Sequence, residues 1–264
     1  MTAIQGIEVR HLDLPLIKPY ALSYRTFESF EPYLVTITTS DGETAFGEQH
    51  ISPGSSSETR EGGWSFLTSS AEAIVGSGIN EVFDQLSSER TQSPVAASAI
   101  LNALDQLKEP GRWTPENDLR IPVLTAFSAT TREQIAIEVN EKIELGFRTF
   151  KIKVGKDVKA DRERVQIIQD TLRNRGTIRV DANRAYSIND AIELSQVLDP
   201  GVCELFEQPC DTDDWDGNGR VAKASPVPLM LDEPICSIAD IERASMMPGV
   251  GFCKVKLKRF GSLG

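Results

Sequence analysis

The sequence predicts an α/β fold, in which an N-terminal α+β module is followed by a parallel sheet built from βα units. Strand-like runs with a hairpin signal open the chain. From Ile121 onward a short apolar run ends in charged residues, a helical stretch follows, and the unit recurs. The length of 264 residues allows either one large domain or two modest ones.

Composition narrows the class of protein. The chain has 28 Lys and Arg against 39 Asp and Glu, a net charge of −11, and 40% hydrophobic residues, which is typical of a soluble globular protein. An acidic balance of this size argues against nucleic acid or an anionic membrane as a partner. Residues 1–10 lack the basic and apolar regions of a signal peptide, so we expect a cytoplasmic protein.

The four cysteines show no Cys-x-x-Cys spacing and lie near predicted strands. We therefore expect reduced thiols in the core rather than a zinc site or disulfides. The residues concerned are Cys203, Cys210, Cys236 and Cys253.

The N-terminal third begins with two strand-like regions, 4–16 and 33–48, and the second turns back at Ser40, Asp41 and Gly42. Polar loops are expected at 18–30 and 51–64. Helical periodicity follows over 71–83 and over 94–107, where Pro94 is placed to open a helix.

Six strands are expected in the repeating region, at 123–127, 149–154, 178–181, 203–207, 229–232 and 252–257. Capping signals precede several of the intervening helices, at 130–133, 187–190 and 237–240. The helix after Glu207 has the weakest pattern, because Gly217 and Gly219 interrupt it.

The last charged residues of five of these strands are regularly spaced. Successive intervals of 28, 26, 25 and 24 residues separate Lys153, Asp181, Glu207, Asp232 and Lys256. In a (β/α) barrel the C-terminal strand ends converge on one face, where the active site lies. Three carboxylates that meet there would favour a hard divalent cation with oxygen ligands.

Lysines flank the carboxylates on both sides. Because strand side chains alternate, we expect Lys151 to share a face with Lys153. We expect Lys254, Lys256 and Lys258 to share a face for the same reason. Repulsion, a nearby metal and desolvation would lower the pKa of a lysine toward the range of a general base. The alternative is that these lysines form structural ion pairs with the same carboxylates.

Five segments taken in order resemble the enolase superfamily, at 149–155, 180–183, 206–209, 231–234 and 254–257. Within it they are similar to the mandelate racemase/muconate lactonizing enzyme family, in the muconate-lactonizing subgroup of muconate cycloisomerases, dipeptide epimerases and N-acylamino acid racemases. Region 4–49 resembles the N-terminal capping domain of that family. The resemblance implies an α+β capping domain at 1–120 and a modified TIM barrel at 121–264.

The resemblance also implies residue roles. Asp181, Glu207 and Asp232 would bind Mg²⁺, with Mn²⁺ as the alternative ion. Lys153 and Lys256 would be bases on opposite faces of a small-molecule carboxylate substrate.

Lys151 would support Lys153 and contact the substrate carboxylate, while Asn183 and Glu233 would help to position the site. Loop residues Tyr20, Arg25 and Ser55 would lie near the substrate, and the family suggests a homo-oligomer.

Lys254 departs from the family pattern, because relatives commonly have a small or neutral polar residue there. A Gly-Gly pair of many relatives is Gly261-Ser262 here. The sequence stops at Gly264, so we expect a barrel that is incomplete after the sixth strand, in a chain that is part of a longer protein.

The implied reaction is abstraction of the proton α to a carboxylate through an enediolate. We favour a racemase, epimerase or cycloisomerase, because a pair of lysines is the minimum that such a reaction needs. Acid-sugar dehydratases often require a histidine, and the only histidines, His11 and His50, lie away from the strand motifs. The alternatives are a dehydratase of the same superfamily, a metal-free Schiff-base lyase that uses a strand lysine, and an inactive fragment.

Overall fold

The computed structural model describes residues 2–21, 26–52 and 57–264. The chain forms two compact units, one of residues 1–119 with 255–264 and one of residues 120–254. Each unit has a hydrophobic core of its own.

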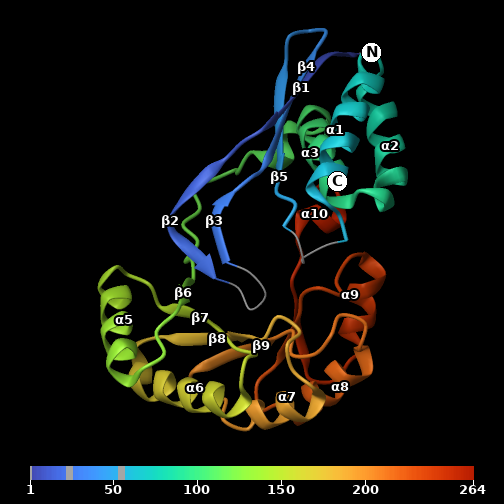
Figure 1. The fold of residues 1–264 in the computed structure, drawn as a ribbon. Helices are drawn as coiled ribbons and strands as arrows, with labels where there is room; N and C mark the ends of the chain where they lie inside the picture. The colour runs from blue at the N-terminus through green and yellow to red at the C-terminus, as the bar shows by residue number, and fades with distance from the viewer. Residues whose placement is uncertain (1, 22–25, 53–56) are drawn as a thin grey trace. The chain divides into compact units, whose positions relative to one another are not determined.

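The first unit contains an antiparallel sheet of three strands, with helices beside it (Figure 1). Its order is β1 (Ile4–His11), β4 (Tyr33–Thr39) and β5 (Thr44–Gln49). Alternate residues of β4 are buried, as expected for a strand with one face on a core. The predicted hairpin between β4 and β5 is confirmed, and Gly42 takes the positive φ of +89° that its turn requires.

A second hairpin replaces the loop expected at 18–30. Strands β2 (Leu14–Ala21) and β3 (Thr26–Phe30) pair antiparallel, with Tyr20 opposite Phe27. Two prolines in β2 hide the strand pattern, but a strand with a free edge tolerates proline because not every N–H is needed for pairing. The expectation of a polar loop was therefore wrong for most of this region.

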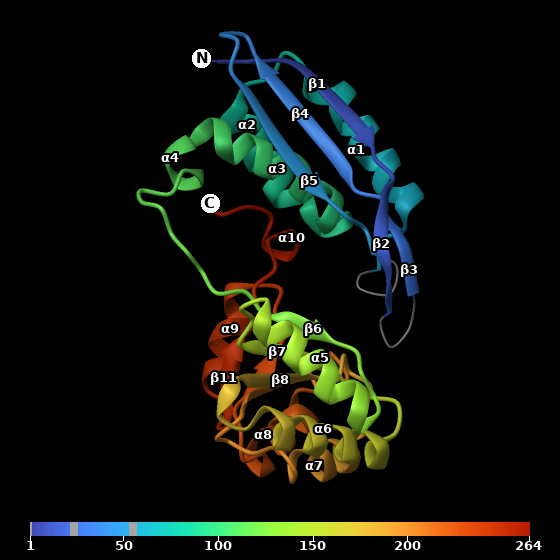
Figure 2. The same cartoon turned by 90° about the vertical axis from the view of Figure 1, so that its left-hand side faces the viewer.

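The helices of the first unit are α1 (Arg60–Ile74), α2 (Ile79–Glu89), η1 (Arg90–Gln92), α3 (Pro94–Lys108), α4 (Pro110–Trp113) and α10 (Leu257–Phe260). Helix α3 lies against β4 and β5, and α1 lies against β1 (Figure 2). Pro94 opens α3 as predicted. The single helix expected over 71–83 was wrong, because Gly76 takes a φ of +88° and separates α1 from α2.

Six parallel strands in chain order form the sheet of the second unit (Figure 1). They are β6 (Thr125–Phe127), β7 (Thr149–Lys153), β8 (Thr177–Asp181), β9 (Cys203–Glu207), β10 (Leu229–Leu231) and β11 (Val250–Cys253). All six predicted strands are present. The last one ends at Cys253 instead of Leu257, because Leu257 begins α10.

Helices connect these strands: α5 (Arg132–Glu144), α6 (Val158–Leu172), η2 (Arg173–Arg175), α7 (Ile188–Ser195), α8 (Trp215–Ala224) and α9 (Ile238–Ser245). The predicted caps are confirmed, since Thr131, Ser187 and Ser237 each accept a hydrogen bond from a backbone N–H in the first turn. Helix α8 forms despite its two glycines, with Asp214 as its cap.

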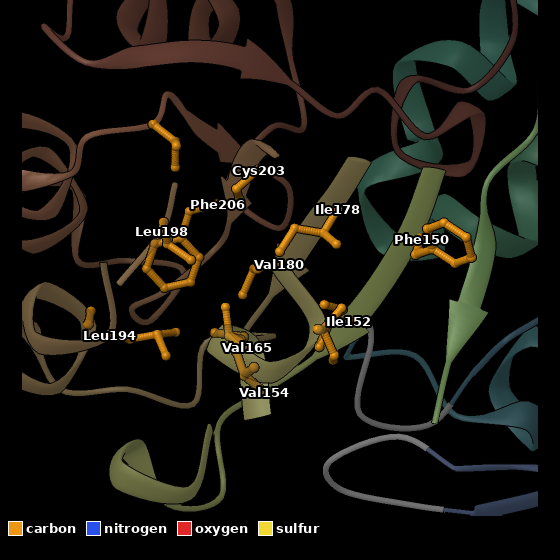
Figure 3. Close-up of a cluster of buried hydrophobic side chains, with 14 of the residues drawn as sticks. Phe150, Ile152, Val154, Val165, Ile178, Val180, Leu194, Leu198, Cys203 and Phe206 are labelled. Carbon is orange, nitrogen blue, oxygen red and sulfur yellow. The ribbon is translucent and has the colours of Figure 1, made fainter. Parts of the chain in front are cut away.

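Alternation along the strands separates an apolar face of the sheet from a polar one. Phe150, Ile152, Ile178 and Val180 are fully buried in the core with the helices (Figure 3). The intervening residues of β7 and β8 lie on the opposite face, in a register that pairs Lys153 with Asp181. The charged residues are thereby placed together on the face away from the helices.

All four cysteines lack disulfide partners. Cys203 and Cys210 are buried, which confirms the expected core thiols, whereas Cys253 is only partly buried and Cys236 is exposed. The expectation was therefore wrong for Cys236, which lies in the connection between β10 and α9. Among the described residues, no helix has the length and apolar character that crossing a membrane requires.

Candidate active site

Three carboxylates lie at the C-terminal ends of neighbouring strands. Asp181 ends β8, Glu207 ends β9 and Asp232 follows β10, and the strand register pairs Asp181 directly with Glu207. Their exposed fractions are 1%, 2% and 2%. Carboxylates buried this deeply need compensating charge or hydrogen bonds.

Lys151 and Lys153 supply part of that charge from β7. The Lys151 Nζ lies 2.7 Å from Asp181 Oδ2 and 2.6 Å from Glu207 Oε2. Lys153 Nζ donates to the same Asp181 Oδ2 at 2.5 Å and to Asn183 Oδ1 at 2.6 Å. Two amines from one strand face therefore converge on one carboxylate.

Lys254 supplies the charge on the other side. It directly follows β11, and its backbone N–H donates to the carbonyl of Leu231. Its Nζ lies 2.7 Å from Glu207 Oε1 and 3.9 Å from Asp232 Oδ2. Lys254 thus links the second and third carboxylates, as Lys151 links the first and second.

Lys256 was expected to share a strand face with Lys254 and Lys258, and this expectation was wrong. The chain leaves the sheet after Cys253, so Lys256 is the residue before α10 and Lys258 lies within that helix. Lys256 belongs to the first compact unit. Its assignment as a base rests on the sequence resemblance alone.

The carboxylates strongly perturb Lys151. Burial lowers the pKa of this lysine, but the negative charges of Asp181 and Glu207 outweigh burial and raise the pKa above its usual value. Burial raises the pKa of the Asp181 carboxyl. The positive charges of Lys151 and Lys153 outweigh burial and bring this pKa down to about 2. The expected lowering of a lysine pKa is therefore reversed at Lys151.

The donor set suits a hard divalent cation, because three buried carboxylates offer the oxygen ligands that Mg²⁺ prefers. Within the described residues, no three Asp, Glu, His or Cys side chains gather closely enough to enclose an ion. Lysine ammonium groups contact the carboxylates instead. The carboxylate oxygens are therefore suitable ligands for a divalent ion. In this structure, lysine ammonium groups balance their negative charge.

Asn183 contacts two of the candidate site residues. Its backbone N–H donates to Asp181 Oδ1 at 2.9 Å, while its side chain accepts from Lys153. Its φ of +45° is unusual for a residue with a side chain. Glu233 directly follows Asp232, and its Oε1 lies 3.7 Å from Arg184 Nε.

Gln208 carries out a positioning role that the sequence analysis did not assign. This fully buried side chain accepts a hydrogen bond from the backbone N–H of Asp232 at 2.9 Å and donates to the carbonyl of Cys210. Its φ is +37°. The sequence feature that could have indicated this role is the place of Gln208 between Glu207 and Pro209, in a motif at a strand end.

The sequence also did not indicate that Arg164 and Asp161 hold the strand ends near the site. The Arg164 guanidinium donates to the carbonyls of Lys153, Ala129 and Phe127, and so ties the ends of β6 and β7 together. Asp161 accepts from the backbone N–H of Gly155 and from the Tyr186 hydroxyl. Both lie on α6, where charged residues in a helical pattern usually indicate a solvated face.

Of the three candidate loop residues, Tyr20 is the one that lies within the described ranges. Tyr20 lies in β2 of the first unit and is 40% exposed. Arg25 and Ser55 lie outside the described residues.

The chain is similar in sequence to known enzymes. Residues 134–264 match the family model described as Enolase C-terminal domain-like. An N-succinyl-L-Arg/Lys racemase from Bacillus cereus is 26% identical, over 98% of this chain and 74% of the relative. Muconate cycloisomerase 1 from Acinetobacter baylyi is 25% identical over the same shares.

A solved structure shows the same fold over nearly the whole chain. The dipeptide epimerase from Enterococcus faecalis, crystallised with Mg and the dipeptide L-Leu-L-Tyr, has a TM-score of 0.88 and 26% identity. The match covers 98% of this chain and 76% of that one. These findings confirm the α/β fold and the resemblance to the mandelate racemase/muconate lactonizing branch of the enolase superfamily, whose C-terminal domain-like model matches residues 134–264.

Proposed function

We propose that this chain abstracts the proton α to the carboxylate of a small organic acid and acts as a divalent-metal-dependent racemase, epimerase or cycloisomerase. The observation that carries the proposal is the convergence of Lys151 and Lys153 on Asp181, beside two further buried carboxylates at neighbouring strand ends. The similarity to racemases, epimerases and a cycloisomerase supports the same kind of reaction.

Asp181, Glu207 and Asp232 would hold Mg²⁺ or Mn²⁺. When bound, the ion supplies stabilisation of the negative charge that develops on the substrate carboxylate. Buried carboxylates on rigid strand ends suit this role, because they are held in position before the ion arrives.

Lys153 would accept the α-proton, and Lys256 would act on the opposite face of the substrate. Lys153 now donates to Asp181 and to Asn183, so it must lose a proton before it can accept one from carbon. Lys151 would remain the cation that contacts the substrate carboxylate, consistent with its raised pKa. Asn183 and Glu233 would be positioning residues.

Other expectations remain part of the proposal. They are a capping domain at 1–120 with a barrel domain at 121–264, substrate contacts from Tyr20, Arg25 and Ser55, a homo-oligomer and a cytoplasmic location. A dehydratase, a Schiff-base lyase and an inactive fragment are the competing outcomes of the experiment below.

The test is α-proton exchange in heavy water with Mg²⁺, followed by NMR over a panel of N-acyl amino acids, dipeptides, muconate-type acids and cyclic amino acids. We expect exchange with at least one class and its loss in Lys153→Ala and in Asp232→Asn. Lys223→Met, which removes an exposed lysine of the same unit, should leave exchange unchanged.

Normal turnover by either site variant would overturn the proposal. Trapping of substrate by borohydride without any metal requirement would favour the lyase, and release of water would favour the dehydratase. Metal binding without exchange for any carboxylate would favour the inactive fragment.

A further inference from the structure

We propose that Lys254 is an internal counter-ion that competes with the divalent cation for Glu207 and Asp232, and so weakens metal binding by this site. The inference rests on the proposed function, because it takes these carboxylates as metal ligands. It starts from the contacts of Lys254, whose Nζ lies 2.7 Å from Glu207 Oε1 and 3.9 Å from Asp232 Oδ2.

Both oxygens of Glu207 are engaged by ammonium groups. Lys254 occupies Oε1, and Lys151 lies 2.6 Å from Oε2. A metal ion that coordinates Glu207 through either oxygen must therefore displace or crowd a lysine. Because Glu207 is 2% exposed, the carboxylate itself has little freedom to turn away.

Of these two lysines, Lys254 is the one that can withdraw more easily. Its side chain is 34% exposed, against 13% for Lys151. A flexible four-carbon stem lets a lysine ammonium move toward water while its backbone remains fixed, and the Lys254 backbone is fixed by its bond to Leu231. Lys151 contacts two carboxylates at 2.7 Å or closer and would stay.

The formal charges of the site also indicate that Lys254 and a divalent cation compete for the carboxylates. The three carboxylates and the ammonium groups of Lys151, Lys153 and Lys254 have formal charges that cancel. A divalent ion that enters while all three lysines stay would leave an excess of positive charge in a largely buried site. Without the Lys254 charge the site is negative, and its attraction for a cation is greater.

The test measures metal binding directly on the full chain, by electron paramagnetic resonance of free Mn²⁺ and by calorimetry with Mg²⁺. Lys254→Met removes the charge but retains most of the side-chain volume. We expect it to lower the Kd of both ions about fivefold or more. Thermal unfolding should show a larger stabilisation by Mg²⁺ in this variant than in the wild type.

Two controls isolate the charge of Lys254. Lys254→Arg keeps the charge, and Lys223→Met removes one exposed lysine of the same unit, so both should stay within about twofold of the wild type. Lys254→Gln provides a second neutral variant if Lys254→Met fails to fold.

An unchanged or higher Kd in the neutral variants would overturn the inference while the proposed function stands. Binding that appears only in the neutral variants would support it in its strongest form. Absence of metal binding in the wild type and in both neutral variants would overturn the inference together with the proposed metal site.

Discussion

The ammonium group of Lys151 on β7 lies 2.6 Å from a carboxylate oxygen of Glu207 on β9, across the intervening strand β8. The same ammonium contacts Asp181 on β8 at 2.7 Å. One side chain thus connects the ends of three strands, and the geometry predicts a role in stability that is separate from any role in catalysis.

Lys151→Met should destabilise the protein by about 3 kcal/mol, because it leaves two buried carboxylates with less compensating charge. Urea unfolding followed by circular dichroism measures the change. The matched control, Lys223→Met on the surface of α8, should stay within about 0.5 kcal/mol of the wild type. Equal effects of the two substitutions would contradict the prediction.

Acid should weaken the fold through Asp181. Its pKa is about 2 in the folded protein, against about 3.9 in an unfolded chain. A lowered folded pKa contributes stability that is fully present above about pH 4 and is lost as the pH falls toward 2.

Unfolding by urea between pH 6 and pH 2.5 tests this dependence in the wild type and in Asp181→Asn. Below about pH 4 the free energy of unfolding of the wild type should fall relative to that of Asp181→Asn, because only the wild type can protonate at this position. A difference that stays constant through the whole range would argue against the shifted pKa.

The first unit depends on a close approach at Gly47 of β5. A Cβ added there would overlap the carbonyl oxygen of Ala99 in α3, whereas a Cβ at Gly6 of β1 would meet nothing within 4 Å. Gly47→Ala should therefore lower the free energy of unfolding by about 2–3 kcal/mol. Gly6→Ala, in the same sheet, should be nearly neutral, and thermal unfolding of both variants checks the contrast. A similar melting temperature for the two would show that β5 and α3 can separate without cost.

Thiol reactivity should differ sharply among the cysteines. Burial raises the pKa of Cys203 to about 12 and of Cys210 to about 11, whereas Cys236 is exposed. Iodoacetamide at pH 8 should modify Cys236 about a hundredfold faster than either buried thiol, because the thiolate is the reactive form.

Peptide mapping by mass spectrometry identifies the modified thiols. Cys236→Ser should remove the fastest reaction, and Cys210→Ser should leave it in place. Rapid labelling of Cys203 in the folded protein would be incompatible with its burial.

Much of the second unit was predictable because its pattern is local. Apolar runs ending in charge, followed by caps such as Thr131 and Ser187, located every strand and several helix starts. The first unit was less predictable. Two prolines obscured the strand pattern of β2. The helical periodicity over 71–83 gave no sign that Gly76 would take a positive φ and separate two helices.

The sequence by itself determined which residues carry the candidate chemistry, because strand alternation and βα spacing place Lys153, Asp181, Glu207 and Asp232 at successive strand ends. Only the tertiary structure decided how these charges pair. Lys254 contacts Glu207, and the strand that was expected to carry Lys256 ends at Cys253. Whether a strand continues depends on hydrogen bonds to a neighbouring strand, and such long-range contacts are not encoded in local periodicity.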